Sequence, residues 1–371
     1  MIKKRVLIIL GTRPEGIKMA PVFLEMKNDD RFDVALCSTG QHKEMLDQVM
    51  NFFDIRPDYN LSVMKSNQTL AGVTAAILEK IDAVLDDFQP DIVLVQGDTT
   101  TVLTGALAAF YKGIKVGHVE AGLRTWDIHT PFPEEANRVL VSKITDFHFA
   151  PTKEAKHNLI KDGVSEDAIF VTGNTVTDAI LQASSIVSSG ANIEAKFRGV
   201  DFDKKIILVT AHRRENLGEN LENISKAVRE ISQREDVEIV FPVHLNPKVR
   251  EVVSRYLDNI DNVHLMEPLD YPDLVWLMNR AHIILTDSGG IQEEAPTLGK
   301  PVLVMRESTE RPEAIKAGTA VLVGANYDLI LSTTNDLLDD KAGLYDKMAK
   351  ATNPYGDGHC SEKIVEILAS S

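Results

Sequence analysis

Short apolar runs recur along the chain and alternate with longer segments in which apolar residues return every three or four positions. The short runs are rich in Val, Ile and Leu without polar alternation, so they predict strands that are buried on both faces. The longer segments predict helices, and residues 70–88 (LAGVTAAILEKIDAVLDDF) show the pattern clearly. In chain order, the predicted strands are KRVLIIL, FDVALCS, DIVLVQ, KVGHV, DFHFA, AIFVT, KIILVT, EIVFPV, NVHLM, HIILT and PVLVM.

Regular alternation of strand and helix is typical of the α/β fold class, in which helices cover parallel sheets. The alternation lapses once, over residues 184–205, which are small, polar and charged. We therefore predict a Rossmann-like domain over 1–183, a linker region over 184–205 and a second Rossmann-like domain over 206–355, with a short helix in 356–371. Ligands of open α/β sheets bind beyond the carboxyl ends of the strands, so the active site is expected in the cleft between the domains.

Length and charge narrow the class of protein. The 371 residues are 44% hydrophobic and 26% charged, which suits two globular domains of about 150 to 200 residues. The formal net charge of −15 argues against a nucleic-acid or membrane-surface partner, because phosphate backbones and anionic lipids attract broad basic faces. An anionic small ligand would instead need local arginines and lysines.

Cysteine content and the lengths of the apolar runs bear on the compartment. Cys37 and Cys360 are too few for a disulfide framework and favour a reducing compartment. The N-terminal apolar run, residues 6–10, is too short for the core of a signal peptide. No stretch of the sequence approaches the about 20 apolar residues of a membrane span. A cytoplasmic protein is therefore expected.

Charged side chains follow the first and third predicted strands. The turn GTRPEGIK (11–18) fits neither the G-x-G-x-x-G dinucleotide pattern nor a P-loop. Pro14 suits a first helical position, which places Arg13 and, one turn later, Lys18 at the expected cleft. An exposed helix cap and a phosphate-binding role explain these cations equally well. Asp98, in QGDTTT, precedes a threonine-rich helix start, where an N-cap is the favoured interpretation over a catalytic acid.

The stretch HVEAGLRTWDIHTPFPEEANR (118–138) carries more acids than a connecting loop needs. Helix chemistry explains part of it, because the proline and glutamates of PFPEE suit the first turn of a helix. An i,i+4 ion pair is predicted between Glu134 and Arg138. Glu120 has no such explanation, since it follows the strand KVGHV at its carboxyl end, where the cleft is expected.

Two motifs stand out in the second predicted domain. In TAHRREN, His212 and Arg213 directly follow a strand. A histidine there can act on a leaving group and an arginine can neutralise phosphate, which is favoured over a plain surface turn. In ILTDSGGIQEEAP, Ser288, Gly289 and Gly290 open a helix whose backbone N–H groups can hold a diphosphate. The alternative is a turn that needs glycine for positive φ.

Neighbouring side chains complete this predicted nucleotide site. Glu294 lies on the following helix, where a carboxylate can accept hydrogen bonds from ribose hydroxyls, and Arg311 adds a cation nearby. The ten histidines show neither H-E-x-x-H nor Cys/His ligand spacing, so no metal site is predicted.

Taken together, the motifs resemble the non-hydrolysing UDP-N-acetylglucosamine 2-epimerases. The resemblance implies two Rossmann-like domains of the glycosyltransferase-B type, a C-terminal helix that returns to the first domain, and a homodimer. It also implies conversion of UDP-GlcNAc to UDP-ManNAc without NAD, metal or another cofactor: UDP leaves C1 as the C2 proton is lost, and the glycal and UDP recombine on the other face. The matching motifs are GTRPEGIKMAP, GQHKEMLDQV, QGDTTT, GHVEAGLRT, PFPEEANR, VTGNTVTDA, TAHRREN, FPVHLNP, TDSGGIQEEAPTLGKPVL, ERPEA and NPYGDG.

Carried over position by position, the resemblance implies catalytic roles for Asp98, Glu120, Glu134 and His212. One carboxylate can take the C2 proton while others stabilise the developing positive charge, and protonation of the opposite face needs a second, differently placed acid. The expected substrate-binding residues are Arg13, Lys18, Arg138, Arg213, Ser288, Gly289, Gly290, Glu294 and Arg311.

One departure concerns a second, activating UDP-GlcNAc site, which many bacterial family members form with Gln-His-x-Gln and Arg-Gln-Thr. Here the stretches read QHKE and NQT, so the altered site comprises Gln41, His42, Glu44 and Asn67. Glu44 and Asn67 stand in place of a neutral amide and an arginine. This loss of positive charge predicts weaker or absent activation by UDP-GlcNAc.

Three other functions fit parts of the pattern. A hydrolysing epimerase that releases ManNAc and UDP would use the same cleft and elimination. A transferase of the glycosyltransferase-B type would share the fold but need an acceptor. A non-catalytic nucleotide-sugar sensor would not need Asp98, Glu120 and Glu134 together.

Overall fold

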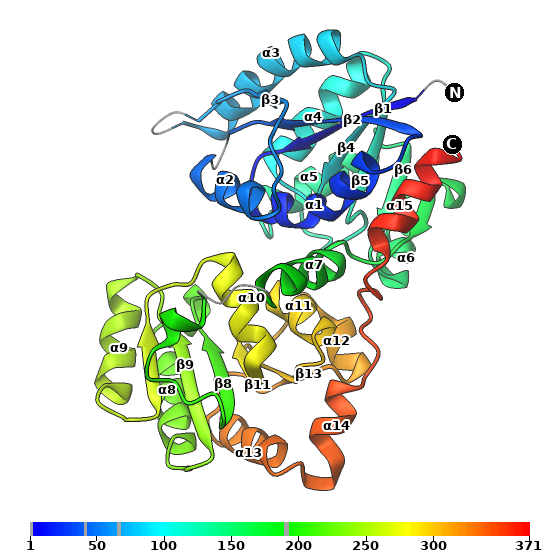
Figure 1. Ribbon diagram of the computed structural model, residues 1–371. Helices are drawn as coiled ribbons and strands as arrows, with labels where there is room; N and C mark the ends of the chain where they lie inside the picture. Colours follow the sequence, from blue (N-terminus) through cyan, green and yellow to red (C-terminus); the bar gives the residue numbers. More distant parts are fainter. Residues whose placement is uncertain (1–2, 41–42, 65–67, 189–192) are drawn as a thin grey trace. The chain divides into compact units, whose positions relative to one another are not determined.

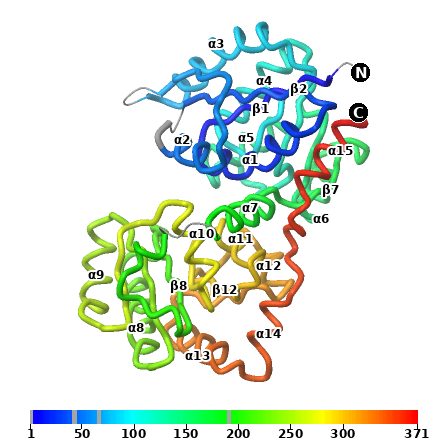
Figure 2. Tube along the Cα trace, in the orientation of Figure 1, coloured from blue at the N-terminus to red at the C-terminus, as the bar shows by residue number. Residues whose placement is uncertain are grey.

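Helix α7 (Val176–Ser188) carries the chain from one folded unit into a second (Figure 1). The structure, a computed structural model, describes residues 3–40, 43–64, 68–188 and 193–371. Unit 1 comprises the chain up to Ala179 together with Tyr355–Ser371, and unit 2 is Ile180–Pro354 (Figure 2). The first crossing thus falls shortly before the predicted linker at 184–205, and the C-terminal segment belongs to unit 1.

The sheet of unit 1 is fully parallel, and its described residues form seven strands in the order β3-β2-β1-β4-β5-β6-β7. Six of them lie where apolar runs predicted strands. The seventh, β3, has two residues and no apolar run, so the sequence pattern did not indicate it. The strands are β1 (Lys4–Leu10), β2 (Phe32–Ser38), β3 (Tyr59–Asn60), β4 (Ile92–Gln96), β5 (Lys115–Val119), β6 (Phe147–Ala150) and β7 (Ile169–Val171).

Helices cover both faces of this sheet. Alternate residues of β1, β2 and β4 form one apolar core with α3, α4 and α5, whereas α1 contacts the same strands from the other face and packs against α2 and α15 (Figure 1). Helix α3 spans the predicted residues 70–88. The helices are α1 (Arg13–Lys27), α2 (Lys43–Phe52), α3 (Leu70–Phe88), α4 (Thr100–Tyr111), α5 (Glu134–Ser142), α6 (Lys153–Lys161), the 3-10 helix η1 (Glu166–Ala168) and α15 (Cys360–Ala369).

The sheet of unit 2 is also parallel, with six strands among its described residues in the order β10-β9-β8-β11-β12-β13. Alternate residues of β8, β9, β11 and β12 form one core with helices α8, α9 and α13. The strands are β8 (Lys205–Thr210), β9 (Val237–Pro242), β10 (Val263–Met266), β11 (Ala281–Thr286), β12 (Val302–Val304) and β13 (Ala320–Leu322).

The helical segments of unit 2 follow its strands in alternation, as the α/β prediction requires. None of the helices formed by the described residues of either unit combines the length and apolar character that a membrane crossing needs. The helices are η2 (Glu194–Phe197), η3 (Arg214–Asn216), α8 (Glu219–Ile231), α9 (Pro247–Leu257), α10 (Tyr271–Arg280), α11 (Ile291–Thr297), α12 (Pro312–Ala317), α13 (Tyr327–Leu338), η4 (Lys341–Gly343) and α14 (Leu344–Ala349).

Strand order reverses at one place in each sheet, between β1 and β4 in unit 1 and between β8 and β11 in unit 2. Ligands of open α/β sheets bind beyond the carboxyl ends of the strands at such a switch point. In unit 1, the residues after β1, β4 and β5 include Arg13, Asp98 and Glu120. In unit 2, the residues after β8 and β11 include His212 and Ser288. The predicted motifs therefore lie at or beside the switch points.

Candidate active site

The turn after β1 is built around the buried carboxyl group of Glu15. Its Oε2 accepts hydrogen bonds from the backbone N of Gly11 (2.7 Å) and of Thr12 (2.6 Å), the N-cap of α1. Its Oε1 accepts from Thr99 Oγ1 (2.5 Å), just before α4. Burial raises the pKa of Glu15 despite these donors. Gly11 has no room for a side chain, because a Cβ there would collide with Thr101. Glu15 thus ties the turn after β1 to the turn after β4.

Arg13 and Lys18, both predicted to bind substrate, have different surroundings. Arg13 is the first residue of α1 and Pro14 the second, so the prediction that Pro14 takes the first helical position is wrong by one residue. It is half-buried and forms no ion pair with any residue that the structure describes, so its charge can serve an anionic ligand. Lys18 Nζ instead lies 2.7 Å from both carboxylate oxygens of Glu120.

Glu120 is held by donors from three different parts of unit 1. Besides Lys18, Gln96 Nε2 donates to its Oε2 and Asn174 Nδ2 donates to its Oε1 at 3.0 Å. These donors come from α1, from the end of β4 and from the segment after β7. Such donors stabilise the negative charge of a buried carboxylate. Glu120 has φ of +63°, a left-handed conformation that a non-glycine residue keeps only where its surroundings hold it.

Gln96 and Asn174 were not indicated by the sequence motifs as functional residues. Gln96 ends the apolar run IVLVQ, and Asn174 lies within VTGNTVTDA, just after β7. Each is a polar residue at the carboxyl end of a predicted buried strand. That position is the signal that could have identified both of them.

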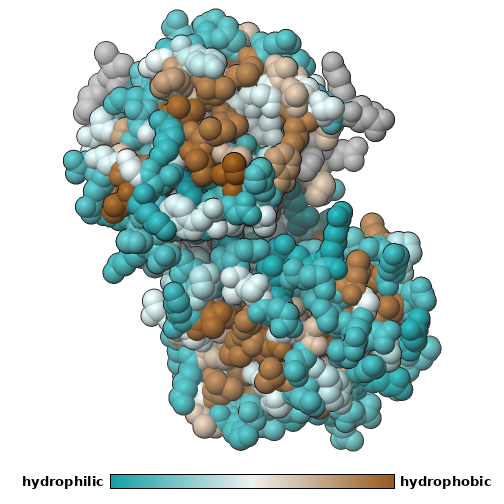
Figure 3. All heavy atoms as spheres, turned by 180° about the vertical axis from the view of Figure 1, so that it is seen from behind, coloured by the Kyte–Doolittle hydropathy of each residue, from teal (hydrophilic) through white to brown (hydrophobic). Residues whose placement is uncertain are grey.

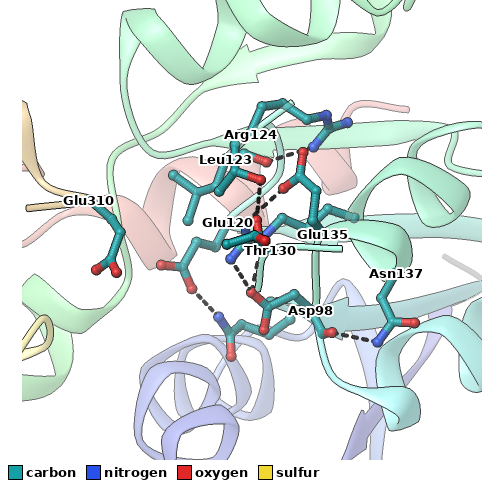
Figure 4. A network of polar contacts seen from close by, with 12 residues as sticks. Asp98, Glu120, Leu123, Arg124, Thr130, Glu135, Asn137 and Glu310 are labelled. Atoms are coloured by element: carbon teal, nitrogen blue, oxygen red, sulfur yellow. Dashed lines mark hydrogen bonds and ion pairs between the residues drawn. The ribbon is translucent and has the colours of Figure 1, made fainter. Parts of the chain in front are cut away.

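Asp98 is not the N-cap that its sequence context favours. Thr99 takes that position, with its side chain accepting a hydrogen bond from Val102 N. The carboxylate of Asp98 instead accepts from Arg138 Nε (2.9 Å) and Nη2 (2.7 Å), both at Oδ2. Asn137 Nδ2 donates to the backbone O of Asp98 at 2.8 Å (Figure 4). Helix α5 therefore positions Asp98 through two consecutive residues.

Arg138 pairs with a different acid from the one predicted. Its Nη1 lies 2.9 Å from Oε2 of the fully buried Glu135, at i,i+3, and Glu135 Oε1 accepts from Trp126 N (3.1 Å). The predicted i,i+4 pair with Glu134 is wrong because Asp98 and Glu135 together take up the guanidinium group. Oε2 of Glu134 is buried, and no described residue donates a hydrogen bond to it. This carboxylate can therefore accept a partner from a substrate.

A buried histidine pair supports the same region from within the sheet. His118 precedes Glu120 by two residues on β5 and is aligned with His148 on β6. His118 Nε2 lies 2.7 Å from the carbonyl O of Gly97, so its N–H can brace the turn that carries Asp98. Burial lowers the pKa of His118 to about 4 and that of His148 to about 3. Both imidazoles are therefore neutral at pH 7.

In unit 2, the buried Asp287 organises the turn after β8. Its Oδ2 accepts hydrogen bonds from His212 N (2.8 Å), Arg213 N (2.8 Å) and Asn216 Nδ2 (3.0 Å), and its Oδ1 lies 3.0 Å from His212 Nδ1. Burial acts to raise the pKa of Asp287, but these donors lower it overall. When Nδ1 of His212 donates to Asp287, Nε2 remains to serve a ligand. The motifs did not indicate Asp287, although an aspartate directly after a buried strand was a usable signal.

Ser288, Gly289 and Gly290 form the turn before α11, as predicted. Gly290 is the N-cap and has φ of −64°, so the alternative that it is needed for positive φ is wrong. A Cβ on Gly289 would lie 3.7 Å from Arg213 Nη2 and 3.9 Å from Glu310 Oε2. These are ordinary van der Waals distances, so Gly289 lies beside a cation and an anion without close contact to either.

Helix α11 anchors this turn and the predicted arginine. Gln292 Nε2 donates to the backbone O of Ser288 at 3.1 Å. Arg311 Nε pairs with Oε1 of the buried Glu293. Glu294, predicted to meet a ribose, is buried on the same helix. Arg311 is therefore engaged with a carboxylate in this structure.

Most of the altered activating site lies outside the described residues. This holds for Gln41, His42 and Asn67, and of Glu44 the structure gives only its place in α2. Weaker activation thus stays a prediction. Over residues 3–40, 43–64, 68–188 and 193–371, no three His, Cys, Asp or Glu residues form a group that could hold a metal ion.

The chain is similar to proteins that share one name. A family model described as UDP-N-acetylglucosamine 2-epimerase matches residues 24–369. The UDP-N-acetylglucosamine 2-epimerase of Salmonella borreze is 51% identical over 372 residues, which cover 99% of this chain and 98% of that protein. The crystal structure of UDP-GlcNAc 2-epimerase from Neisseria meningitidis bound to UDP-GlcNAc is 48% identical, with a TM-score of 0.88, and the match covers 99% of this chain and 100% of that one.

An enzyme of lower sequence identity to this chain has the same name and a similar structure. The crystal structure of the Methanocaldococcus jannaschii UDP-GlcNAc 2-epimerase in complex with UDP-GlcNAc and UDP is 37% identical, with a TM-score of 0.79, over 99% of this chain and 100% of that one. The matches to these three proteins cover 99% of this chain and so extend over both units, and the family model covers both units from residue 24 onwards. The chain therefore belongs to the UDP-N-acetylglucosamine 2-epimerase family.

Proposed function

We propose that the protein interconverts UDP-GlcNAc and UDP-ManNAc by reversible epimerisation at C2 without net hydrolysis. The observation that carries this proposal is a set of three differently held carboxylates in unit 1. Glu120 is buried beside Lys18, Asp98 is paired with Arg138, and Glu134 has a buried oxygen to which no described residue donates. Proton removal, charge stabilisation and proton return need different acids and bases, whereas binding alone does not.

The chemistry of the substrate explains the need for these groups. The C2 proton is not acidic in the ground state and becomes removable as the C1–O bond breaks and positive charge develops on the ring. UDP leaves with the electron pair of that bond, a base takes the C2 proton, and a glycal remains. UDP then adds back to C1 while an acid returns a proton to the other face of C2. The reaction has no net change in protons or electrons.

The three carboxylates of unit 1 suit different steps. Glu134 is proposed to exchange a proton with C2, because no described residue donates a hydrogen bond to one of its carboxylate oxygens. Asp98 accepts two hydrogen bonds from the guanidinium group of Arg138, and its carboxylate can stabilise the positive charge of the ring. Glu120 has an ammonium group beside it in Lys18, so this pair contains both a carboxylate and a proton. We propose the Lys18–Glu120 pair as the second proton-exchanging group.

Unit 2 is proposed to hold the diphosphate and to help UDP leave. In the turn Ser288–Gly290, the backbone N of Ser288 donates to Thr286 Oγ1 at 3.0 Å, so the proposed diphosphate donors are the N–H groups of Gly289 and Gly290, with Arg213 beside them. His212, oriented by Asp287 through Nδ1, can present Nε2 to a phosphate oxygen as the C1–O bond breaks. Relatives crystallised with UDP-GlcNAc and with UDP support this class of ligand. The predicted placement of the site in a cleft between the domains stays a prediction.

The test is NMR of UDP-GlcNAc with the purified protein in D₂O. Epimerisation predicts deuterium at C2 and a UDP-ManNAc signal with little free UDP. A hydrolysing epimerase would accumulate UDP and free sugar, and a transferase or sensor would show no exchange at C2. Absence of deuterium at C2 would overturn the proposal.

We also propose a homodimer located in the cytoplasm. Figure 3 shows hydrophobic side chains gathered on part of the surface of unit 1. Phe110 and Tyr111 at the end of α4, and Leu140 on the neighbouring α5, are each more than half exposed, and clustered exposed apolar side chains favour association. Sedimentation equilibrium tests the dimer, because a monomer at micromolar concentration would contradict it.

The proposed cytoplasmic location rests on the free cysteines Cys37 and Cys360. Both are buried thiols, which suits a reducing compartment.

A further inference from the structure

Asn174 lies between the carboxylate of Glu120 and the point where the chain returns to unit 1. Its Nδ2 donates to Glu120 Oε1 at 3.0 Å, and its backbone N donates to the carbonyl O of Tyr355 at 2.6 Å. Tyr355 is the first residue of unit 1 after the return. The Oδ1 of Asn174 accepts from Val176 N (3.2 Å), the first residue of α7. One buried residue therefore joins a proposed catalytic carboxylate to both crossings of the chain.

Close packing fixes the backbone of this segment. Gly173 has φ of +92°, and a Cβ there would lie 2.9 Å from the carbonyl O of Tyr355. On α7, the carboxylate of Asp178 accepts hydrogen bonds from the backbone N of Ser361 (2.7 Å) and of Cys360 (3.2 Å), which begin α15. The segment that carries Asn174 is thus packed closely against the returning chain at Gly173 and hydrogen-bonded to it at Asn174 and Asp178.

Glu120 needs a donor of fixed direction. Its carboxylate is buried and its backbone has the left-handed conformation described above, so its orientation depends on its neighbours. The ammonium group of Lys18 is a point charge on a flexible stem and can pair with a carboxylate in many orientations. The planar amide of Asn174, on a fixed backbone, restricts that orientation much more, and it acts on Oε1 while the amide of Gln96 donates to Oε2.

We propose that Asn174 is a positioning residue for the epimerase reaction and that its amide sets the orientation of the Glu120 carboxylate. The inference rests on the proposed function and on the role of Glu120 within it. An amide group does not titrate near neutral pH, so it holds the carboxylate without competing for the proton that the reaction moves.

Asn174→Asp separates the two functions of this side chain. Aspartate keeps an oxygen for Val176 N, and with it the start of α7, but replaces the donor to Glu120 with a second carboxylate. We expect kcat at pH 8 to fall at least about 30-fold, with KM changed less than about threefold, because the orientation of a reacting group is lost. The loss should shrink at pH 6, since two adjacent carboxyl groups that share a proton regain a hydrogen bond.

A matched control is Asn326→Asp in unit 2. Asn326 Oδ1 accepts from Leu329 N (3.0 Å) as the N-cap of the exposed start of α13, so the same exchange preserves a cap without touching the proposed site. Its kinetics should equal those of the parent protein. If circular dichroism shows that Asn174→Asp does not fold, Asn174→Ser is the second test variant. The serine hydroxyl can accept a hydrogen bond at the start of a helix, as Asn174 does, but it is too short to reach Glu120. For this variant the same loss of kcat is expected, without recovery at pH 6.

Glu120→Gln distinguishes the two ways in which the inference can fail. If Glu120→Gln keeps the parental rate of deuterium exchange at C2, the proposed role of Glu120 is wrong, whatever Asn174 variants do. If Glu120→Gln is inactive while folded Asn174→Asp or Asn174→Ser keeps the parental kcat, the positioning role of Asn174 is overturned. The inference is supported if kcat is low in Glu120→Gln and in the Asn174 variants, and if the loss in Asn174→Asp is smaller at pH 6 than at pH 8.

Discussion

Lys18 Nζ lies 2.7 Å from each carboxylate oxygen of Glu120, and this ion pair joins helix α1 to the residue after strand β5. The two side chains are 14% and 5% exposed. At such burial, removing one partner leaves an uncompensated charge that costs several kcal/mol. The resemblance implied a substrate- or UDP-holding role for Lys18, and the ion pair adds a direct relation to a proposed catalytic carboxylate.

The first prediction concerns this pair. Lys18→Met should lower kcat by about 100-fold or more, because Glu120 loses its counter-charge and the adjacent proton. The Kd of UDP, measured by isothermal titration calorimetry, should change less than about threefold if Lys18 acts mainly on Glu120. Lys112→Met, which removes a surface pair with Asp82 and Asp86, is the control and should leave both values unchanged. A large rise in the Kd of UDP with unchanged kcat would show that Lys18 is a diphosphate ligand only.

The second prediction concerns the guanidinium group that bridges Asp98 and Glu135. Arg138→Lys keeps the charge but cannot reproduce the forked contacts, so kcat should fall about 10- to 100-fold. The rate of deuterium exchange at C2 is the measurement. Arg31→Lys is a matched control, because Arg31 also bridges two carboxylates, Asp29 and Glu366, on an exposed surface. Parental exchange in Arg138→Lys would mean that Asp98 needs no such positioning.

The third prediction concerns the partner of His212. Asp287→Asn keeps the shape of the side chain but removes the charge that orients the imidazole, and kcat should fall about 100-fold or more. Steady-state kinetics across pH 6 to 9 would measure this fall. Asp273→Asn weakens the ion pair of the buried Asp273 carboxylate with the exposed Lys196 in the same unit, and it should lower stability while kcat of the folded protein stays parental. An equal kcat in Asp287→Asn and the parent would remove Asp287 from the mechanism.

The fourth prediction concerns stability and pH. The pKa values of His118 and His148 are lowered to about 4 and about 3, so the unfolded chain binds more protons than the folded one below about pH 6.5. The free energy of unfolding should therefore fall as the pH drops from about 6.5 towards 4. His148→Phe should reduce this slope by up to about 1.4 kcal/mol per pH unit. Urea unfolding of the parent protein and of His148→Phe at pH 5, 6 and 7 measures how the free energy of unfolding of each depends on pH. Equal slopes for the two proteins would contradict the prediction.

Local patterns were enough to predict most of the fold. Runs such as IVLVQ are apolar on both faces and therefore form strands inside a parallel sheet that helices cover on both sides. Residues 70–88 form α3 because their apolar residues recur at the helical period and so lie on one face of the helix. Strands β3 and β13 were not predicted, and β3 has only two residues, which carry no period. The same patterns placed Asp98, Glu120 and His212 just after strands, which is where this fold binds ligands.

The sequence by itself thus determined the elements and the chemical groups at their ends, because periodicity, capping and turn formation depend on neighbours along the chain. Only the tertiary structure decided which groups meet. Lys18 and Glu120 are 102 residues apart, Asp98 and Arg138 are 40 apart, and Asp287 and His212 are 75 apart. Their contacts follow from the strand orders that place β1 beside β4, β4 beside β5, and β8 beside β11. The sequence of a single strand does not specify which strands lie next to it in the sheet. Strand order likewise brings Asp98 to Arg138, whose partner on its own helix is Glu135 at i,i+3 and not the predicted Glu134 at i,i+4.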